Sequence, residues 1–173
     1  MSNQIHILFV CTGNICRSPA AEAAFARFAE EAGIRDRVVI DSAAIENFHE
    51  GEPPDPRAIK AGAKRGLDLS QLRARQVDGW DFDDFDFILA MDKGHKLKLE
   101  QMKPMNAPAE IKMMRDYDSR HTGDDIADPF YGGPEGFELM LDHIEDSARG
   151  MVQAIQFFQL KPREGHASHG AQA

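Results

Sequence analysis

Short apolar runs rich in β-branched and aromatic residues alternate along the chain with segments whose apolar residues recur at helical spacing. The predicted strands span residues 5–10, 38–41, 85–92 and 110–117. The predicted helices span residues 18–33, 55–66, 93–102 and 134–159. Acidic and aromatic residues alternate at 80–87, where we expect a turn and a strand edge with a solvated acidic face. This order predicts an α/β fold in three layers, α/β/α, around a four-stranded parallel sheet with right-handed crossovers.

The first predicted strand runs into the loop CTGNICRSP, residues 11–19, which connects it to the first helix. Ser18 and Pro19 are predicted as the N-cap and first residue of that helix. A loop that enters a helix N-terminus presents backbone N–H groups and the positive end of the helix dipole, so it forms an anion site. Gly13 lets this loop curl. The same field stabilises a thiolate, which makes Cys11 a candidate nucleophile at neutral pH.

Arg17 gives the loop the chemistry of a phosphate site, because a guanidinium offers paired planar donors to two phosphoryl oxygens through the transition state. A Walker loop is excluded, since it needs Gly-Lys-Ser or Gly-Lys-Thr before the helix. Cys11 and Cys16 lack a partnering pair at zinc spacing, so we expect no metal and no cofactor. An isolated Cys-x5-Arg would favour a buried cysteine and an exposed arginine, but the motif here is much longer.

The length, composition and net charge of the chain limit its domain organisation, its binding partners and its cellular location. We expect one domain at residues 1–160 and a disordered tail at 161–173, which lacks apolar periodicity. The net charge of −9 argues against a general nucleic-acid or anionic membrane surface. Neither a secretory signal nor an apolar run of membrane-spanning length is seen, so a cytoplasmic location is expected.

The loop motif, together with Asp-Pro-Phe at 128–130, resembles the low-molecular-weight protein tyrosine phosphatases. The likeness continues through GEPPDPRA, RARQ and FILAMD and covers nearly all of the chain except the tail. It implies that Cys11 is the nucleophile, Arg17 binds the phosphoryl group, Ser18 supports the thiolate and Asp128 is the general acid. It also implies hydrolysis of phosphotyrosine in proteins and of small aryl phosphates through a phosphocysteine, with phosphate or vanadate as ligands of the site.

The role of Asp128 has a chemical reason of its own. A phenolate leaves poorly near neutral pH because its conjugate acid has a pKa of about 10, so a carboxylic acid should protonate it. The resulting carboxylate can then take a proton from the water that attacks the phosphocysteine. An acidic loop residue before a proline is the alternative, with Asp124 and Asp125 nearby, and the loop motif favours the catalytic role.

The remaining substrate contacts come from the loop and from aromatic side chains. The predicted loop contacts are Thr12, Gly13, Asn14, Ile15, Cys16 and Ser18. Phe48, Phe130 and Tyr131 resemble the aromatic walls that hold the substrate ring in the family, with core packing as an equal alternative for Phe130. His49 lies beside this cleft either as a substrate contact or as a solvated loop histidine.

Three positions leave questions open. Gln71 stands where relatives often carry a histidine that supports the loop asparagine, and its amide can still hydrogen-bond Asn14. The segment 42–45 reads SAAI in place of the usual Ser-Ala-Gly-Thr, so its loop is expected to differ in shape. Cys16 is a candidate thiol for trapping an oxidised Cys11 as a disulfide, and packing beneath the loop is the alternative.

Two other functions are considered. A thiol-dependent arsenate reductase resembles this fold and loop but passes electrons through later cysteines, and none follows Cys16. A phosphotyrosine-binding module without turnover would need neither the nucleophile Cys11 nor the acid Asp128. The sequence therefore favours the phosphatase.

Overall fold

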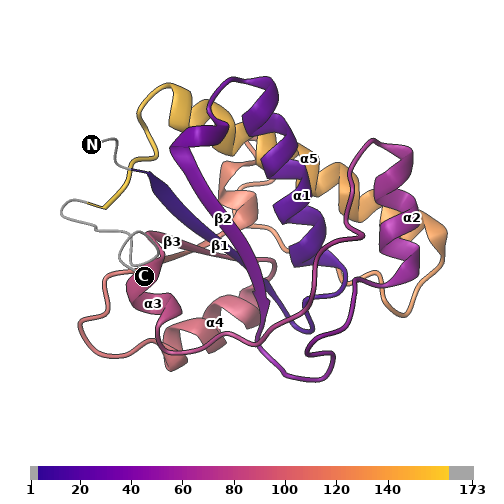
Figure 1. The fold of residues 1–173 in the computed structure, drawn as a ribbon, viewed down its shortest axis with the longest axis horizontal. Helices are drawn as coiled ribbons and strands as arrows, with labels where there is room; N and C mark the ends of the chain where they lie inside the picture. The colour runs from indigo at the N-terminus through magenta and orange to yellow at the C-terminus, as the bar shows by residue number, and fades with distance from the viewer. Residues whose placement is uncertain (1–3, 164–173) are drawn as a thin grey trace.

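The computed structural model of the chain describes residues 4–163. Its strands are all parallel and lie in the order β2-β1-β3-β4 (Figure 1). The strands are β1 (Ile5–Cys11), β2 (Val38–Ala44), β3 (Phe87–Ala90) and β4 (Glu110–Met113). The α-helices are α1 (Arg17–Glu31), α2 (Pro56–Lys64), α3 (Asp81–Asp84), α4 (Lys93–Met102) and α5 (Pro134–Gln156), with short 3-10 helices η1 (Arg35–Arg37) and η2 (Met114–Tyr117). The predicted fold class is confirmed.

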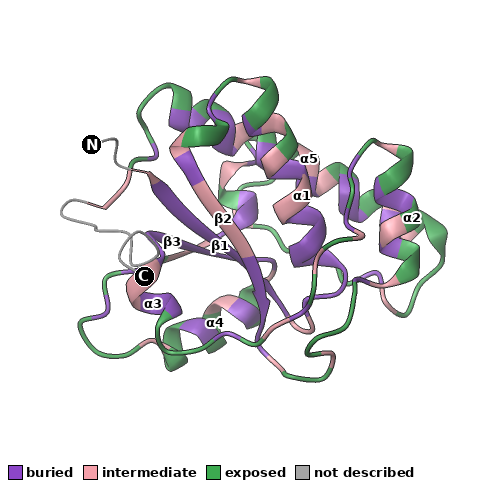
Figure 2. Cartoon of the chain, in the orientation of Figure 1, coloured by how far each residue is buried: buried purple, intermediate pink, exposed green. Residues whose placement is uncertain are grey.

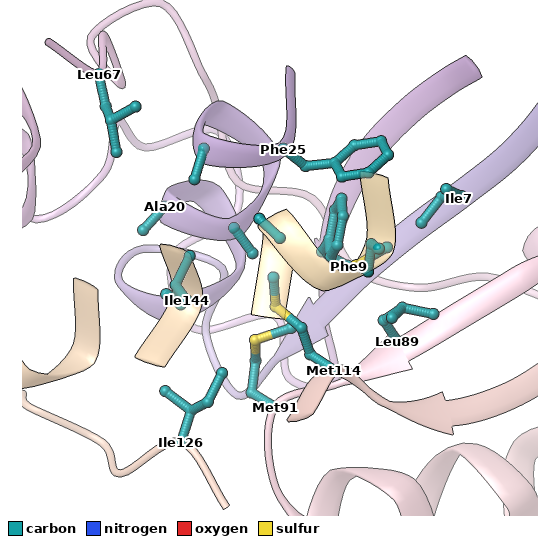
Figure 3. Close-up of a cluster of buried hydrophobic side chains, with 14 of the residues drawn as sticks. Ile7, Phe9, Ala20, Phe25, Leu67, Leu89, Met91, Met114, Ile126 and Ile144 are labelled. Atoms are coloured by element: carbon teal, nitrogen blue, oxygen red, sulfur yellow. The ribbon is translucent and has the colours of Figure 1, made fainter. Parts of the chain in front are cut away.

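Strand β1 is buried along its whole length, as Figure 2 shows, because helices cover both faces of the sheet. Alternate side chains of a strand point to opposite faces. Ile7 and Phe9 pack in the core beneath α1 and α5, where Figure 3 shows Phe9 beside Phe25. Leu8 and Val10 pack in a second core against α3 and α4. This two-sided burial explains why the first apolar run is unbroken.

The order of the strands places a ligand site at one edge of the sheet. Helix α1 connects β1 to β2 in one direction, whereas β3 continues through α4 to β4 in the other. The strand order therefore reverses between β1 and β3, and ligands of such sheets bind at the carboxyl ends of the strands at that point. Cys11 ends β1, and Asp92 follows β3 at the same edge.

Two local predictions are wrong. The fourth strand ends at Met113, where the backbone turns into η2 because the Asp116 carboxylate accepts the Met113 N–H at 3.1 Å. The acidic stretch at 80–87 is not a solvated strand edge but contains α3, and Asp81 within it is 4% exposed. Arg75 holds Asp81 with two hydrogen bonds of 3.0 Å.

Residues 164–173 of the predicted tail lie outside the described residues, while the Arg163 N–H donates to Asp86 at 3.0 Å. Within residues 4–163, no helix combines the length and the apolar character that crossing a membrane requires.

Candidate active site

The loop between β1 and α1 is tied to its surroundings through its carbonyl groups. These accept three hydrogen bonds of 2.9–3.0 Å from two neighbouring segments: Ile45 donates to Cys11, Glu46 to Thr12 and Asp55 to Ile15. Within the described part of the chain, by contrast, the backbone N–H groups of residues 12–17 have no acceptor in the protein. A series of free N–H groups at the start of a helix is the arrangement that binds phosphate and other oxyanions.

Cys11 lies at the base of this loop and is 3% exposed. Its Sγ is 3.1 Å from the Ser18 Oγ and accepts the Ser18 N–H at 3.4 Å. Both contacts can stabilise negative charge on sulfur. The prediction of Ser18 as the N-cap is wrong, because α1 begins at Arg17 after Cys16 and the serine hydroxyl is directed to Cys11.

Asn14 holds the loop from behind. Its backbone has φ 58°, in the left-handed region that asparagine tolerates better than most residues. Its amide donates to the Ser18 Oγ at 2.7 Å and to the Ser42 Oγ at 3.0 Å, and its side-chain oxygen accepts the Arg75 N–H at 3.2 Å. The amide thereby links α1, β2 and the phosphate loop.

The hydrogen bond that the Gln71 amide could make to Asn14 is absent from the described residues. Gln71 is exposed, and its amide donates to the neighbouring Ser70 Oγ at 3.4 Å. Instead, the Asn14 amide nitrogen donates to Ser42, and its amide oxygen accepts from the Arg75 backbone N–H. The altered segment 42–45 begins in β2 and reaches the loop through Ile45.

Arg17 is 3% exposed and is held in a fixed orientation. Its Nη1 donates to the Asp92 carboxylate and to the Ile126 carbonyl, each at 2.9 Å. Burial raises the pKa of Asp92, but the His95 N–H and nearby positive charge outweigh burial and keep the pKa below its ordinary value. An ionised Asp92 therefore neutralises one end of the guanidinium and leaves the other, Nη2, directed toward Asp128 at 3.5 Å.

His95 supports the opposite side of the loop. Its Nε2 lies 2.7 Å from the Thr12 Oγ1, and its Nδ1 lies 3.3 Å from an Asp92 carboxylate oxygen. Burial lowers the pKa of His95 to about 4, so the imidazole is neutral at physiological pH. The sequence analysis missed His95 and Asp92 as site residues. The sequence pattern that could have identified them is Asp-x-x-His at the start of α4, directly after a strand that ends beside β1.

The loop opens into a cleft that brings most of the predicted site together. It is lined by Cys11, Thr12, Gly13, Ile15, Cys16, Arg17, Phe48, His49, Asp128, Phe130 and Tyr131. Asn14 and Ser18 do not line it, because both are buried behind the loop. At Gly13 a Cβ would lie 2.9 Å from the His49 ring, so a larger residue there would require the histidine side chain to shift.

Asp128 and the aromatic residues form the outer wall of the cleft. The Asp128 side chain is 44% exposed, and its Oδ1 accepts the Phe130 N–H at 3.0 Å. Tyr131 is 93% exposed and meets the Phe130 ring edge-on at 5.0 Å between centroids. Phe130 also packs partly against the core. It therefore lies both in the cleft and against the core, the two alternatives predicted for it. Phe48 is 69% exposed at the cleft.

The chain is similar in sequence to known proteins over most of its length. The family model described as low molecular weight phosphotyrosine protein phosphatase matches residues 6–159. A low molecular weight protein-tyrosine-phosphatase of Streptomyces coelicolor is 39% identical over 153 residues, covering 87% of this chain and 93% of the relative.

Solved structures agree with the sequence match. A protein tyrosine phosphatase from Entamoeba histolytica, crystallised with Hepes in its active site, has a TM-score of 0.86 and 34% identity, covering 91% of this chain and all of the other. A Drosophila arginine phosphatase has a TM-score of 0.81 and 31% identity, covering 87% of this chain and 97% of the other. The chain belongs to the low-molecular-weight phosphotyrosine protein phosphatase family.

Proposed function

We propose that this protein-tyrosine phosphatase hydrolyses phosphotyrosine by a double displacement in which Cys11 is the nucleophile. The observation that carries the proposal is the set of free N–H groups at residues 12–17, curled between the Cys11 sulfur and the Arg17 guanidinium. This arrangement supplies donors for phosphoryl oxygens on one side and a nucleophile on the other.

In the first step the loop N–H groups and Arg17 bind the phosphoryl oxygens. The Cys11 thiolate attacks phosphorus, an S–P bond forms and the bond to the tyrosine oxygen breaks. Asp128 gives its proton to the leaving oxygen, so the tyrosine departs as a neutral phenol. The Ser18 hydroxyl, 3.1 Å from the sulfur, stabilises the thiolate before attack and after release.

In the second step water attacks the phosphocysteine. The Asp128 carboxylate takes a proton from that water, the S–P bond breaks and inorganic phosphate leaves. Arg17 remains bound to Asp92 throughout, so its free end can follow the equatorial oxygens without reorganising. The cycle consumes water and requires no metal ion.

The apolar and aromatic lining of the cleft supports an aryl ester as the substrate. Its lining includes Ile15 and the aromatic side chains Phe48, Phe130 and Tyr131. Their flat faces suit the ring of a phosphotyrosine in a protein. The similar Drosophila protein is an arginine phosphatase, so phosphoarginine is the informative competing substrate. We infer action in the cytoplasm, where a free Cys11 and Cys16 stay reduced.

Phosphate release tests the proposal when it is measured with chelator present on a phosphotyrosine peptide, an aryl phosphate and phosphoarginine. The expected result is turnover of the first two, little turnover of phosphoarginine, and inhibition by vanadate. Cys11→Ser should abolish turnover yet still bind phosphate, because Arg17 and the loop N–H groups remain. Wild-type turnover in Cys11→Ser, or a preference for phosphoarginine, would overturn the proposal.

A further inference from the structure

A second cavity lies beside the catalytic cleft, between α2 and the start of α5. Its volume is about 200 Å³. The buried Phe137 ring and Pro134 give it apolar walls, and Arg57, Lys60 and Lys64 bring basic groups from α2. In Figure 1 α2 lies next to the orange segment that leads into α5, and Figure 2 shows exposed positions on α2.

The cavity adjoins the cleft: no residue lines both, but residues that line one contact or directly follow residues that line the other. Arg57 lines the cavity, and its Nη1 donates to the carbonyl of Phe130, a cleft residue, at 3.0 Å. Its guanidinium also lies 5.3 Å from the Phe130 ring and 4.9 Å from the Phe137 ring. Gly132, another lining residue, directly follows the cleft residue Tyr131. A polypeptide with one side chain in the cleft can therefore place a neighbouring side chain in the cavity.

Only one of the three basic side chains that line the cavity has an acidic partner among the described residues. Arg57 pairs with Asp55 at 2.8 Å, and the acidic lining residue Glu138 is held by Arg65 at 2.7 Å. Lys60 and Lys64 are exposed and form no ion pair with any residue in the range 4–163. Two uncompensated ammonium groups on one helix face are notable in a chain whose net charge is −9. They give this cavity a local attraction for negative charge.

We propose that the cavity is a specificity subsite for an acidic side chain of the substrate, close in sequence to the phosphotyrosine. Lys60 and Lys64 attract the carboxylate, while Phe137 and Pro134 contact the methylene groups. This rests on the proposed phosphatase function and names the class of polypeptide that the enzyme prefers. Because both lysines are solvated, the preference is about three- to thirtyfold in kcat/KM and weakens with salt.

Two matched phosphotyrosine peptides test the subsite, one with glutamates flanking the phosphotyrosine and one with glutamines. The wild type should favour the glutamate peptide at low ionic strength. The double variant Lys60→Glu with Lys64→Glu should lose that preference while still hydrolysing the glutamine peptide and a small aryl phosphate normally. Its control is Lys103→Glu with Lys161→Glu, which changes the net charge equally at residues that line neither cavity nor cleft.

The outcomes separate this subsite from the proposed function. Equal kcat/KM for the two peptides in the wild type overturns the subsite, as does an equal loss of preference in the control, which would show steering by overall charge. Failure of the wild type to hydrolyse either peptide would instead contradict the phosphatase mechanism. Thermal unfolding of both double variants checks that these surface changes leave the fold intact.

Discussion

At the scale of single residues, the site is organised before substrate binds. Arg17 is almost fully buried, and bonds to the Asp92 carboxylate and the Ile126 carbonyl fix its orientation. The loop itself is held by the Asn14 amide and by His95 through Thr12. Holding donors in place avoids their reorganisation during phosphoryl transfer, which is how preorganised sites lower a barrier.

Asp128→Asn should slow hydrolysis of phosphotyrosine by about 10² to 10⁴-fold, because the amide cannot protonate the leaving phenolate. Aryl phosphates with more acidic leaving groups need less help and should lose less. The measurement is kcat/KM across a series of substituted phenyl phosphates, with Asp124→Asn as a matched control. An equal loss across the series would assign Asp128 a structural role.

Cys16 is a candidate resolving thiol for an oxidised Cys11, but the structure predicts slow resolution at neutral pH. Burial, together with the charges of Asp55 and Cys11, raises the pKa of the Cys16 thiol well above its ordinary value. The Cys16 thiolate attacks the sulfenic acid of oxidised Cys11 and displaces hydroxide, so formation of the disulfide after brief peroxide treatment should accelerate as pH rises.

Intact-mass analysis after peroxide should show the loss of two hydrogens, reversed by dithiothreitol. With Cys16→Ser the same treatment should leave irreversible sulfinic or sulfonic Cys11. Unchanged recovery in that variant would return Cys16 to a packing role beneath the loop.

At the scale of elements, α1 and β2 meet behind the phosphate loop through a partly buried carboxyl group. Glu22 of α1 accepts the Ser42 hydroxyl of β2 at 2.7 Å, and Ser42 in turn accepts from Asn14. Burial raises the pKa of Glu22 to about 7, against the lowering effect of the Ser42 bond. Asp41 also raises the pKa, while Arg35 and Arg75 lower it.

This carboxyl group should make the fold less stable as pH rises from about 4.5 to about 7. In that window the unfolded chain has released the proton that folded Glu22 still binds, so folding becomes less favourable by on the order of 2 kcal/mol. Glu22→Gln should gain stability relative to the wild type between pH 5 and pH 8 by that amount. Urea unfolding at both pH values measures it, with the exposed Glu30→Gln on the same helix as control. Parallel pH profiles for the wild type and Glu22→Gln would contradict this.

The sequence predicts elements well where the pattern is local and poorly where a distant partner decides. The period of apolar residues located every strand of the sheet and the long helix α5. The burial of Asp81 depends on Arg75, and the backbone turn after Met113 depends on Asp116, so neither shows in hydrophobic periodicity. Likewise the Ser18 hydroxyl serves Cys11 rather than the helix end.

The same distinction between local patterns and distant partners applies to the residues of the site. The loop motif predicted which residues meet around the cleft, since residues 11–17 are contiguous and the fold brings Asp128 to them. Asp92 and His95 cannot be identified from a local motif, because their partners, Arg17 and Thr12, lie far away in sequence. Asn14 is satisfied by Ser42 and not by Gln71 for the same reason. The chemical roles of Cys11, Arg17 and Asp128 stay predictions until they are tested.

At the scale of the whole molecule, the catalytic loop rests on a strand that is covered by two cores. Phe9, two residues before Cys11, is fully buried and lies 5.8 Å from the Phe25 ring of α1. Phe9→Ala should cost about 3–5 kcal/mol in the free energy of unfolding, because it removes buried contacts and leaves a cavity. Denaturant unfolding measures this, with exposed Phe157→Ala as control. A loss below about 1 kcal/mol would show that the core does not depend on this ring.

The phosphocysteine is tested most directly by intact-mass analysis of acid-quenched enzyme during turnover. In Asp128→Asn, an aryl phosphate with a good leaving group should complete the first step while the second step, which needs the carboxylate, is slow. The predicted result is a mass gain of one phosphoryl group that maps to Cys11 and is absent from Cys11→Ser. Continued turnover by Cys11→Ser, or a phosphoryl group mapped to any other residue, would contradict the mechanism.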